Sequence, residues 1–372
     1  MDKRAIFVAA TGQNVGKTTV CLGLVAGLKK RVGSVGYLKP VGQEHIRTEM
    51  GINVDKDVAL FKSHFQLKED YDKMSPVLFP KGFTRDFLDG KVDRQSLIEK
   101  ISSSFMEIAK ENQMSVIEGT GHTGVGSIVD LNNAQVAALL KCPVLLVASG
   151  GLGSSFDELS LNYTQCEKYQ VPIAGVILNR VLDAKREMII EYMKKALKKW
   201  NVPLLGCIPF EPFLSAPTMS DFEQLFETEA LSGSAHRLRH FQHIRLVASP
   251  VEMYGTHITH NQLIITPASR EDIILTTLTH YWDAKIADPG KELKVGMILT
   301  GRHPPKASVL EQIHRADIPA LYIPLSSFIT MKMITTYTTK IRKEDTLKIE
   351  EAIRVVEEEV DFDLLLPKNC IF

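Results

Sequence analysis

The 372-residue chain has few cysteines, no excess of either charge and no long hydrophobic run. Its five cysteines lack any CxxC spacing, which argues against a disulfide scaffold or a zinc knuckle and favours a reducing compartment. Lysine plus arginine and aspartate plus glutamate number 44 each, so no global field attracts nucleic acid or an anionic membrane. These features favour an ordinary globular protein.

No apolar run approaches the ~20 residues that a membrane-spanning helix needs. Residues Met1–Arg4 lead directly into the first predicted strand, with no apolar region of the signal-peptide kind. We therefore expect a cytoplasmic protein with no membrane or nucleic-acid partner. The length suffices for two domains, each with its own core.

The stretch AIFVAATGQNVGKTT, residues 5–19, carries the strongest functional signal. A β-branched, apolar run stops at Thr11-Gly12, and Gly16-Lys17-Thr18-Thr19 then opens an apolar helical pattern. Strand, glycine-bearing loop and helix in this order form the context of a phosphate-binding loop, although Ala10 and Thr11 stand where the first glycine of the common pattern belongs. Backbone N–H groups of such a loop converge on phosphate. We predict nucleotide contacts from Gly12, Gln13, Asn14, Val15, Gly16, Lys17, Thr18 and Thr19.

Short apolar runs then alternate with helical periodicity, which predicts a doubly wound, mostly parallel α/β sheet covered on both faces. Expected strands are 34–38, 115–117, 144–148, 173–178 and 204–208, and expected helices are 96–110, 133–140, 155–169 and 184–200. In such sheets, ligands bind beyond the carboxyl ends of the strands. The residues that directly follow each strand are therefore the candidates for a site.

Charged and glycine-rich residues follow these strands. Lys39 comes after the second strand and could serve as another cation for developing phosphate charge. Glu118 ends the third, a natural position for a carboxylate that holds Mg²⁺ or its water. The motif NVDKDVAL offers Asp55 and Asp57 for the remaining metal contact, although Asp57 could instead be only the N-cap of the next helix.

Residues 1–215 resemble the dethiobiotin synthetase type of P-loop domain through the motifs ATGQNVGKTT, YLKPVG, VDKDVAL, IEGTG, GVILNRV and LGCIPFEP. The resemblance implies ATP and Mg²⁺ as cofactors. It implies that Lys17 and Thr18 bind phosphate and Mg²⁺, and that Lys39 neutralises the reacting carbamate or phosphate. Asp57 and Glu118 would complete the metal site, and Asn179 would contact the adenine edge.

The same resemblance assigns the Gly150–Ser155 loop to a substrate carboxylate near a dimer interface, with Gly151, Ser154 and Ser155 as candidates. We accordingly expect a homo-oligomer that binds a nucleotide and a small carboxylate. The family's paired glycines after Glu118 are not repeated, since His122 replaces the last one. The resemblance therefore implies nucleotide binding for this chain, but it does not imply the family's carboxylation of a diamino acid.

The segment SPVLFPKGFTRDFLDG and the second half resemble the amino-terminal part of long bacterial phosphate acetyltransferases, in which a DRTGG domain follows. The matching pieces are LIITP, SREDII and GMILTG, while the contiguous string D-R-T-G-G is absent. We expect residues 216–372 to form this smaller α/β domain, regulatory or oligomerising, with strands at 263–265, 295–299 and 320–323 and helices at 271–281, 308–315 and 343–359. Phosphate acetyltransferase activity is not expected from this polypeptide, because the family's acyltransferase domain has no counterpart in it.

Two functions of different class remain open. The chain is either an ATP- and Mg²⁺-dependent enzyme that phosphorylates a carboxylate or carbamate, with Lys17 and Lys39 as catalytic residues, or a nucleotide-responsive regulatory protein. A glutamine-dependent amidotransferase is disfavoured, because the second half has no cysteine nucleophile in a strand-to-helix elbow with a downstream histidine.

Overall fold

The computed structural model describes residues 4–48, 51–288 and 293–366, and in that part the chain divides into two compact units. The first unit holds residues 4–211 and 341–366, and the second holds residues 212–340. We expected the second domain to run from residue 216 onward. The structure differs from that expectation after residue 340, because the chain there returns to the first unit.

The first unit is built on a six-stranded sheet with the order β10-β9-β8-β1-β7-β2, and every neighbouring pair in it is parallel. The strands are β1 (Ala5–Ala10), β2 (Val35–Leu38), β7 (Met114–His122), β8 (Val144–Ser149), β9 (Ile173–Val181) and β10 (Leu204–Pro209). All six residues of β1 are buried, as are the first five of β8. Continuous apolar strands of this kind are typical of a parallel sheet covered on both faces, so the expected fold class is confirmed.

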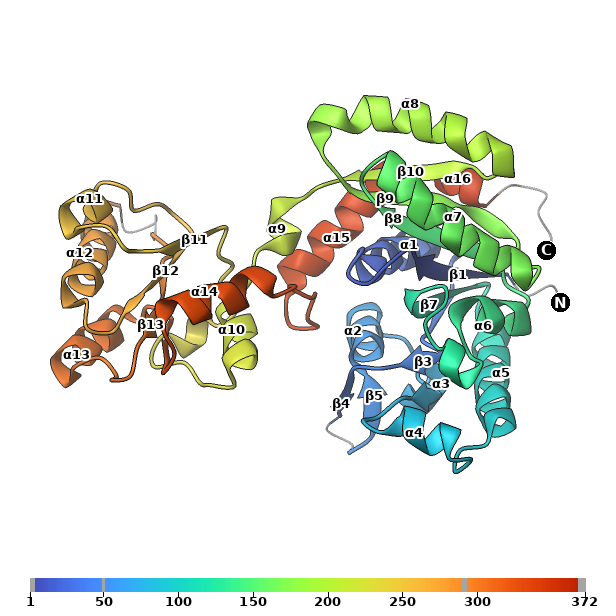
Figure 1. Ribbon diagram of the computed structural model, residues 1–372, viewed down its shortest axis with the longest axis horizontal. Coiled ribbons are helices and arrows are strands. Elements are labelled where there is room, and N and C mark those ends of the chain that lie inside the picture. Colours follow the sequence, from blue (N-terminus) through green and yellow to red (C-terminus); the bar gives the residue numbers. More distant parts are fainter. Residues whose placement is uncertain (1–3, 49–50, 289–292, 367–372) are drawn as a thin grey trace. The chain divides into compact units, whose positions relative to one another are not determined.

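Helices cover both faces of this sheet because the crossovers run in opposite directions (Figure 1). The crossover through α1 runs from β1 toward β2, whereas those through α5 to α8 run the other way. Right-handed crossovers therefore put α1 on one face and the later helices on the opposite face. The helices are α1 (Lys17–Val32), α5 (Arg94–Glu111), α6 (Asn133–Leu140), α7 (Gly153–Lys168) and α8 (Arg186–Leu197), with 3₁₀ turns η1 (Ser127–Val129), η2 (Asp183–Lys185) and η3 (Lys198–Trp200).

An excursion between β2 and α5 adds two small two-stranded sheets beside the main one. It contains β3 (Val41–Gly42), β4 (His45–Arg47), β5 (Asn53–Asp55), α2 (Lys56–Phe65), α3 (Tyr71–Met74), β6 (Val77–Leu78) and α4 (Phe83–Leu88). Strand β5 leads directly into α2, whose residue Phe61 stacks on Tyr37 of β2 with ring centroids 3.8 Å apart. This packing fixes the start of α2 next to the end of β2.

The C-terminal helix α15 (Thr346–Glu359) packs on α1, which explains why the chain returns to the first unit. Two glycines on α1 make this close approach possible. A Cβ added at Gly23 would lie 2.2 Å from Cβ of Val356, and one at Gly27 would lie 2.3 Å from the ring of Phe362 in α16 (Phe362–Leu365). The last strand β10 is joined as well, because the N–H of Asp361 donates to the carbonyl of Leu205 at 2.8 Å.

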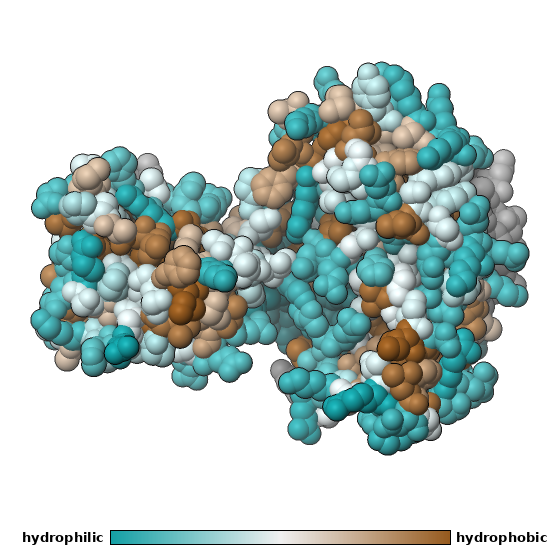
Figure 2. Space-filling view, in the orientation of Figure 1, coloured by the Kyte–Doolittle hydropathy of each residue, from teal (hydrophilic) through white to brown (hydrophobic). Residues whose placement is uncertain are grey.

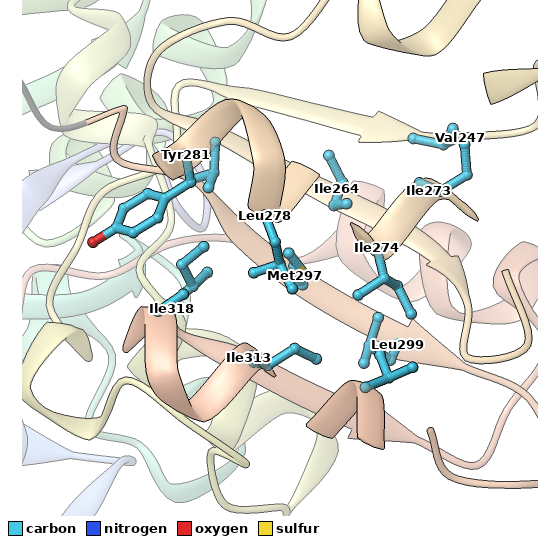
Figure 3. Close-up of a cluster of buried hydrophobic side chains, with 14 of the residues drawn as sticks. Val247, Ile264, Ile273, Ile274, Leu278, Tyr281, Met297, Leu299, Ile313 and Ile318 are labelled. Atoms are coloured by element: carbon cyan, nitrogen blue, oxygen red, sulfur yellow. The ribbon is translucent and has the colours of Figure 1, made fainter. Parts of the chain in front are cut away.

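The second unit holds a four-stranded parallel sheet with the order β11-β12-β13-β14. Its strands are β11 (His243–Leu246), β12 (Gln262–Pro267), β13 (Gly296–Thr300) and β14 (Ala320–Ile323), and its crossover helices are α11 (Val251–Gly255), α12 (Glu271–Ala287) and α13 (Ala307–Ala316). All three crossovers step in the same direction, so these helices share one face. Figure 3 shows the resulting core, in which Ile274 and Leu278 of α12 meet Met297 and Leu299 of β13.

The opposite face of this second sheet is covered by α10 (Met219–Phe226) and α14 (Ser327–Thr336), which pack a separate buried cluster around Phe222, Ile265 and Ile298. The short elements α9 (Pro212–Ser215) and η4 (Ser234–His236) complete the unit. The expected strands of this small α/β unit and its expected helices at 271–281 and 308–315 are present, whereas the helix expected at 343–359 belongs to the first unit as α15 and strand β11 was not predicted. Its residues His243–Leu246 are half-exposed or exposed and give no apolar run.

Both units present mixed surfaces. On the visible face of the first unit, hydrophilic residues predominate and interrupt separate hydrophobic patches (Figure 2). Scattered exposed apolar side chains are normal for a globular protein. Within the described ranges, none of the helices combines the length and the apolar character required to cross a membrane.

Candidate functional site

The loop between β1 and α1 has the backbone of an anion-binding turn. Asn14 has a positive φ of 55° and Gly16 one of 101°, both in the left-handed region. Consecutive N–H groups in turns of this kind, together with the start of a helix, form a concave set of donors that favours phosphate. A side chain at Gly16 would also meet Asn179, since its Cβ would lie 2.1 Å from Nδ2 of that residue.

Asn179 holds this loop against the end of β9. Its Nδ2 donates to the carbonyl of Val15 at 2.8 Å, and its Oδ1 accepts from the N–H of Arg180 at 3.0 Å. The side chain is 4% exposed, so both contacts are shielded from water. Asn179 therefore lies beside the loop between β1 and α1, and its amide fastens that loop; the predicted contact with an adenine edge stays a prediction.

Lys17 is the first residue of α1 and lies at the mouth of the loop. Among the described residues, no hydrogen bond or ion pair reaches its ammonium group. Burial lowers the pKa of Lys17, and the nearby charge of Glu118 opposes that effect. A half-buried cation at a helix start, where the macrodipole is also positive, is suited to an incoming anion.

Thr18 and Glu118 meet directly at the edge of the sheet. The Thr18 hydroxyl donates to Oε1 of Glu118 at 3.1 Å, and the Tyr37 hydroxyl donates to Oε2 at 2.8 Å. Glu118 is 1% exposed and lies within β7, in register with Val8 of β1. The strand that we expected to end at Glu118 continues to His122. Both carboxylate oxygens are thus oriented by neighbouring hydroxyl groups.

Lys39, at the end of β2, lies among three carboxylates. Its Nζ forms a short ion pair with Oδ2 of Asp57, lies 3.2 Å from Oε1 of Glu118, and lies 3.8 Å from Oδ1 of Asp55. Burial alone would lower the pKa of Lys39, but Asp57, Glu118 and Asp55 outweigh it and raise that pKa well above its usual value. Lys39 is therefore a buried, charged lysine whose charge is locally cancelled.

The structure distinguishes the roles of Asp55 and Asp57, one as the N-cap of α2 and the other as a partner of Lys39. Asp55 is the N-cap of α2, because its Oδ1 accepts from the N–H of Asp57 at 3.0 Å. Asp57 is in the first turn of that helix and turns its carboxylate to Lys39. Burial raises the pKa of Asp55 to about 6, and Lys39 opposes the rise. The possible N-cap role of Asp57 is thus wrong, and its carboxylate remains with the candidate site.

The donor set at this edge fits a hard divalent cation. The Thr18 hydroxyl and the carboxylates of Asp57 and Glu118 are oxygen ligands of the kind that Mg²⁺ takes. A cationic group already lies between the two carboxylates, namely the ammonium of Lys39. In the part of the chain that the structure describes, no three His, Cys, Asp or Glu side chains group closely enough to hold a metal by themselves. A metal here would need the threonine hydroxyl or the phosphates of a ligand.

The loop Gly150–Ser155 follows β8 at the same edge. A Cβ at Gly150 would lie 2.6 Å from the carbonyl oxygen of Arg180, so the two loop backbones touch. Ser155 is 1% exposed and donates from Oγ to the carbonyl of Ser149 at 2.6 Å, whereas Ser154 is exposed. Ser155 thus closes the start of α7, and the assignment of Gly151, Ser154 and Ser155 to a substrate carboxylate stays a prediction.

Two further parts of the site were not predicted from the sequence. Tyr37, the oriented partner of Glu118, looks like an ordinary buried aromatic residue of a strand. Asn162 of α7 accepts on Oδ1 from both the N–H and the hydroxyl of Thr123, at 3.0 Å and 2.7 Å, and so holds the segment after β7. The Thr11 hydroxyl donates to Glu158 of the same helix at 2.8 Å. The sequence signal that could have indicated these contacts is the pair of polar residues Glu158 and Asn162, which lie one helical turn apart.

A parallel, doubly wound sheet with a phosphate-type loop after its central strand defines a class of nucleotide-binding α/β domain. The comparisons agree, since the AAA domain model AAA_26 matches residues 4–218, and the chain belongs to this family. The DRTGG domain model matches residues 223–337, within the second unit. Both matches confirm the resemblances that the motifs indicated.

Individual relatives match over different lengths. The phosphate acetyltransferase of Nitratidesulfovibrio vulgaris is 24% identical over 96% of this chain, and the alignment covers 50% of that relative, so the chain spans about half its length. The ATP-dependent dethiobiotin synthetase BioD of Bacillus subtilis subsp. natto is 28% identical over 55% of this chain and 87% of its own length. Among solved structures, the MinC:MinD cell division protein complex of Aquifex aeolicus matches at 16% identity and a TM-score of 0.37, over 57% of this chain and 83% of that chain.

Proposed function

We propose that the first unit binds ATP with Mg²⁺ at the carboxyl edge of its sheet and uses it to phosphorylate a small carboxylate or carbamate. The observation that carries this proposal is the Thr18 hydroxyl beside Glu118, at the start of the helix that Lys17 opens. A hydroxyl, a buried carboxylate and a lysine ammonium that forms no ion pair within the described part of the chain provide the parts that a metal–triphosphate complex needs. The similarity to an ATP-dependent synthetase over the first unit supports the same assignment.

In this proposal the loop N–H groups of residues 12–17 and the ammonium of Lys17 bind the phosphates. Thr18, Asp57 and Glu118 would hold Mg²⁺, which when bound neutralises charge on the phosphate oxygens. A substrate carboxylate oxygen attacks the terminal phosphorus, the bond to the bridging oxygen breaks, and the products are an acyl phosphate and ADP. Lys39 stabilises the charge on the transferring group, and no proton is gained or lost by the carboxylate.

Binding is tested by calorimetry with Mg²⁺ and a non-hydrolysable ATP analogue. Lys17→Ala should weaken the affinity about 10- to 100-fold, because a charge-assisted hydrogen bond contributes about 1.5–3 kcal/mol. Lys30→Ala is the matched control, since Lys30 belongs to the same helix but pairs with Glu357 at 2.6 Å. Equal affinities of wild type and Lys17→Ala would contradict the site.

The second candidate is a nucleotide-responsive regulatory protein in which the second unit binds a partner or effector. It is favoured by the alignment with a phosphate acetyltransferase that runs through both units yet covers half of that enzyme. Measuring ADP release with and without a panel of small carboxylates separates the two functions. Carboxylate-dependent ADP release supports the transferase, whereas tight binding with no stimulated release supports the regulator.

We also propose a homo-oligomer formed through the first unit, so that the exposed Ser154 at the start of α7 faces a substrate bound by a second copy. Sedimentation velocity at micromolar protein, with and without ATP and Mg²⁺, tests it. A dimer or larger species in either condition supports the shared site. A monomer in both conditions overturns it.

A further inference from the structure

The ammonium group of Lys39 lies where a bound metal ion would need to interact. It contacts Asp57 and Glu118, which are two of the three residues proposed to hold Mg²⁺. Thr18, the third, is hydrogen-bonded to the same Oε1 of Glu118 that Lys39 approaches. One carboxylate oxygen thus accepts from a hydroxyl and lies beside an ammonium.

The electrostatics explain why a cation belongs here even without a ligand. Glu118 is 1% exposed and the Lys39 side chain is 7% exposed, so neither charge is well solvated. A buried charge is costly unless it is paired, and Lys39 supplies the partner for Asp57 and Glu118 at once. Asp55 lies 3.8 Å away and adds a third carboxyl group. Together with the Thr18 hydroxyl beside Glu118, the cluster therefore offers the oxygen donors of a metal site in which a lysine occupies the cation position.

We infer that Lys39 is a resident counter-ion that competes with Mg²⁺ for Asp57 and Glu118, so that metal–nucleotide binding displaces its ammonium group and makes it available to an anionic substrate. This inference rests on the metal site of the proposed function and adds an order of events to it. With no metal bound, the charge of Lys39 is cancelled by its own carboxylates and attracts no substrate anion. The substrate-binding cation appears only once the metal has taken its place.

The length and flexibility of the side chain suit such an exchange. Lysine is a point charge on a four-carbon stem with rotatable donors, so its head can move while its stem stays packed. Lys17 at the start of α1 differs from Lys39, because among the described residues no carboxylate forms an ion pair with the ammonium of Lys17. The two lysines therefore form a matched pair for an experiment: removing one exposes a cation position between carboxylates, and removing the other does not.

The test measures the thermal unfolding midpoint, Tm, in the absence of nucleotide. Each variant is measured in Mg²⁺ and in KCl of equal ionic strength. Lys39→Met should lower Tm by about 10 °C, because it removes the cation that compensates the clustered carboxylates. Millimolar Mg²⁺ should recover most of that loss by binding the folded state. Wild type and Lys17→Met should respond to Mg²⁺ no more than to KCl, and adding Asp57→Asn to Lys39→Met should abolish the recovery.

Lys39→Gln provides a second variant that keeps a hydrogen-bond donor without the charge. A Mg²⁺ response confined to the Lys39 variants supports the exchange. Three results would overturn the exchange. They are an equal Mg²⁺ response in wild type, no Mg²⁺ response in the Lys39 variants, and failure of both Lys39 variants to fold even in Mg²⁺. Because no nucleotide is present, this result is independent of ATP binding. If wild type binds Mg²⁺–ATP but the Lys39 variants do not respond to Mg²⁺, only the exchange is refuted. If the Lys39 variants respond to Mg²⁺ but wild type binds no Mg²⁺–ATP, only the nucleotide site is refuted.

Discussion

The hydroxyl of Thr18 lies 3.1 Å from Oε1 of Glu118, which joins the first turn of α1 to strand β7. These two residues are 100 positions apart in sequence and meet because β1 and β7 are parallel neighbours. Their contact connects the phosphate loop to the carboxylate cluster around Lys39. The expected effect of replacing Thr18 depends on that connection.

Thr18→Val should weaken binding of Mg²⁺–ATP about tenfold while changing the binding of metal-free ATP less. Valine has the shape of threonine but offers no oxygen to a metal, and it removes the hydroxyl that orients Glu118. Calorimetry in Mg²⁺ and in EDTA measures both affinities. Thr18→Ser keeps the hydroxyl and should restore the Mg²⁺ dependence; a serine variant as weak as valine would argue against a metal-binding hydroxyl.

Asn179→Ala should destabilise the first unit by about 1–3 kcal/mol, because the buried Val15 carbonyl and Arg180 N–H both lose their partner. Asn179→Asp should weaken nucleotide binding more than alanine does. The aspartate still accepts from Arg180 but faces the Val15 carbonyl with a negative oxygen beside the phosphate loop. Urea unfolding and nucleotide titration check the two parts, and an aspartate variant with wild-type affinity would contradict the role in the loop.

Gly23→Ala should destabilise the protein by about 1–3 kcal/mol, the usual cost of overpacking, because its Cβ would lie 2.2 Å from Cβ of Val356. Val356→Gly removes the Cβ atom and the two methyl groups that crowd this position. In a double-mutant cycle the pair should therefore cost less than the sum of the single changes. Additive costs would mean that α15 does not pack on α1 in solution.

The described thiols should be inert in the native protein. Burial raises the pKa of Cys142 and of Cys166 to about 12, and it raises the pKa of Cys21 and Cys207 as well. In a Cys370→Ser background, which removes a cysteine outside the described residues, a thiol reagent at pH 8 should label no cysteine rapidly. Unfolding in guanidinium should release four, and rapid native labelling of any one would contradict the buried arrangement.

Much of the fold was predictable because local patterns determine it. Strand β14 and helix α6 have the bounds that apolar periodicity predicted, and both lie where one face or both are buried. The convergence of Lys17, Lys39 and Glu118 followed from a single rule, that parallel strands end at the same edge. That part of the site was encoded in what comes after each strand.

The remainder depends on contacts that no local pattern carries. The return of α15 to α1 rests on Gly23 and Gly27, two glycines four residues apart in a helix, which read as weak helix formers unless a partner helix is known. The choice of Asp55 over Asp57 as the cap of α2 was set by a two-residue difference in where the helix begins. Strand β11 is polar and exists because β12 offers it a parallel edge.

The most direct test of the central claim is a crystal structure with Mg²⁺ and a non-hydrolysable ATP analogue. The account predicts the terminal phosphates against the N–H groups of residues 12–17, with Lys17 on the outer phosphates. It predicts the metal on Thr18 and Glu118, with the ammonium of Lys39 withdrawn from Asp57. A nucleotide bound elsewhere, or bound here with Lys39 still between Asp57 and Glu118 and no metal beside Thr18, would contradict the account.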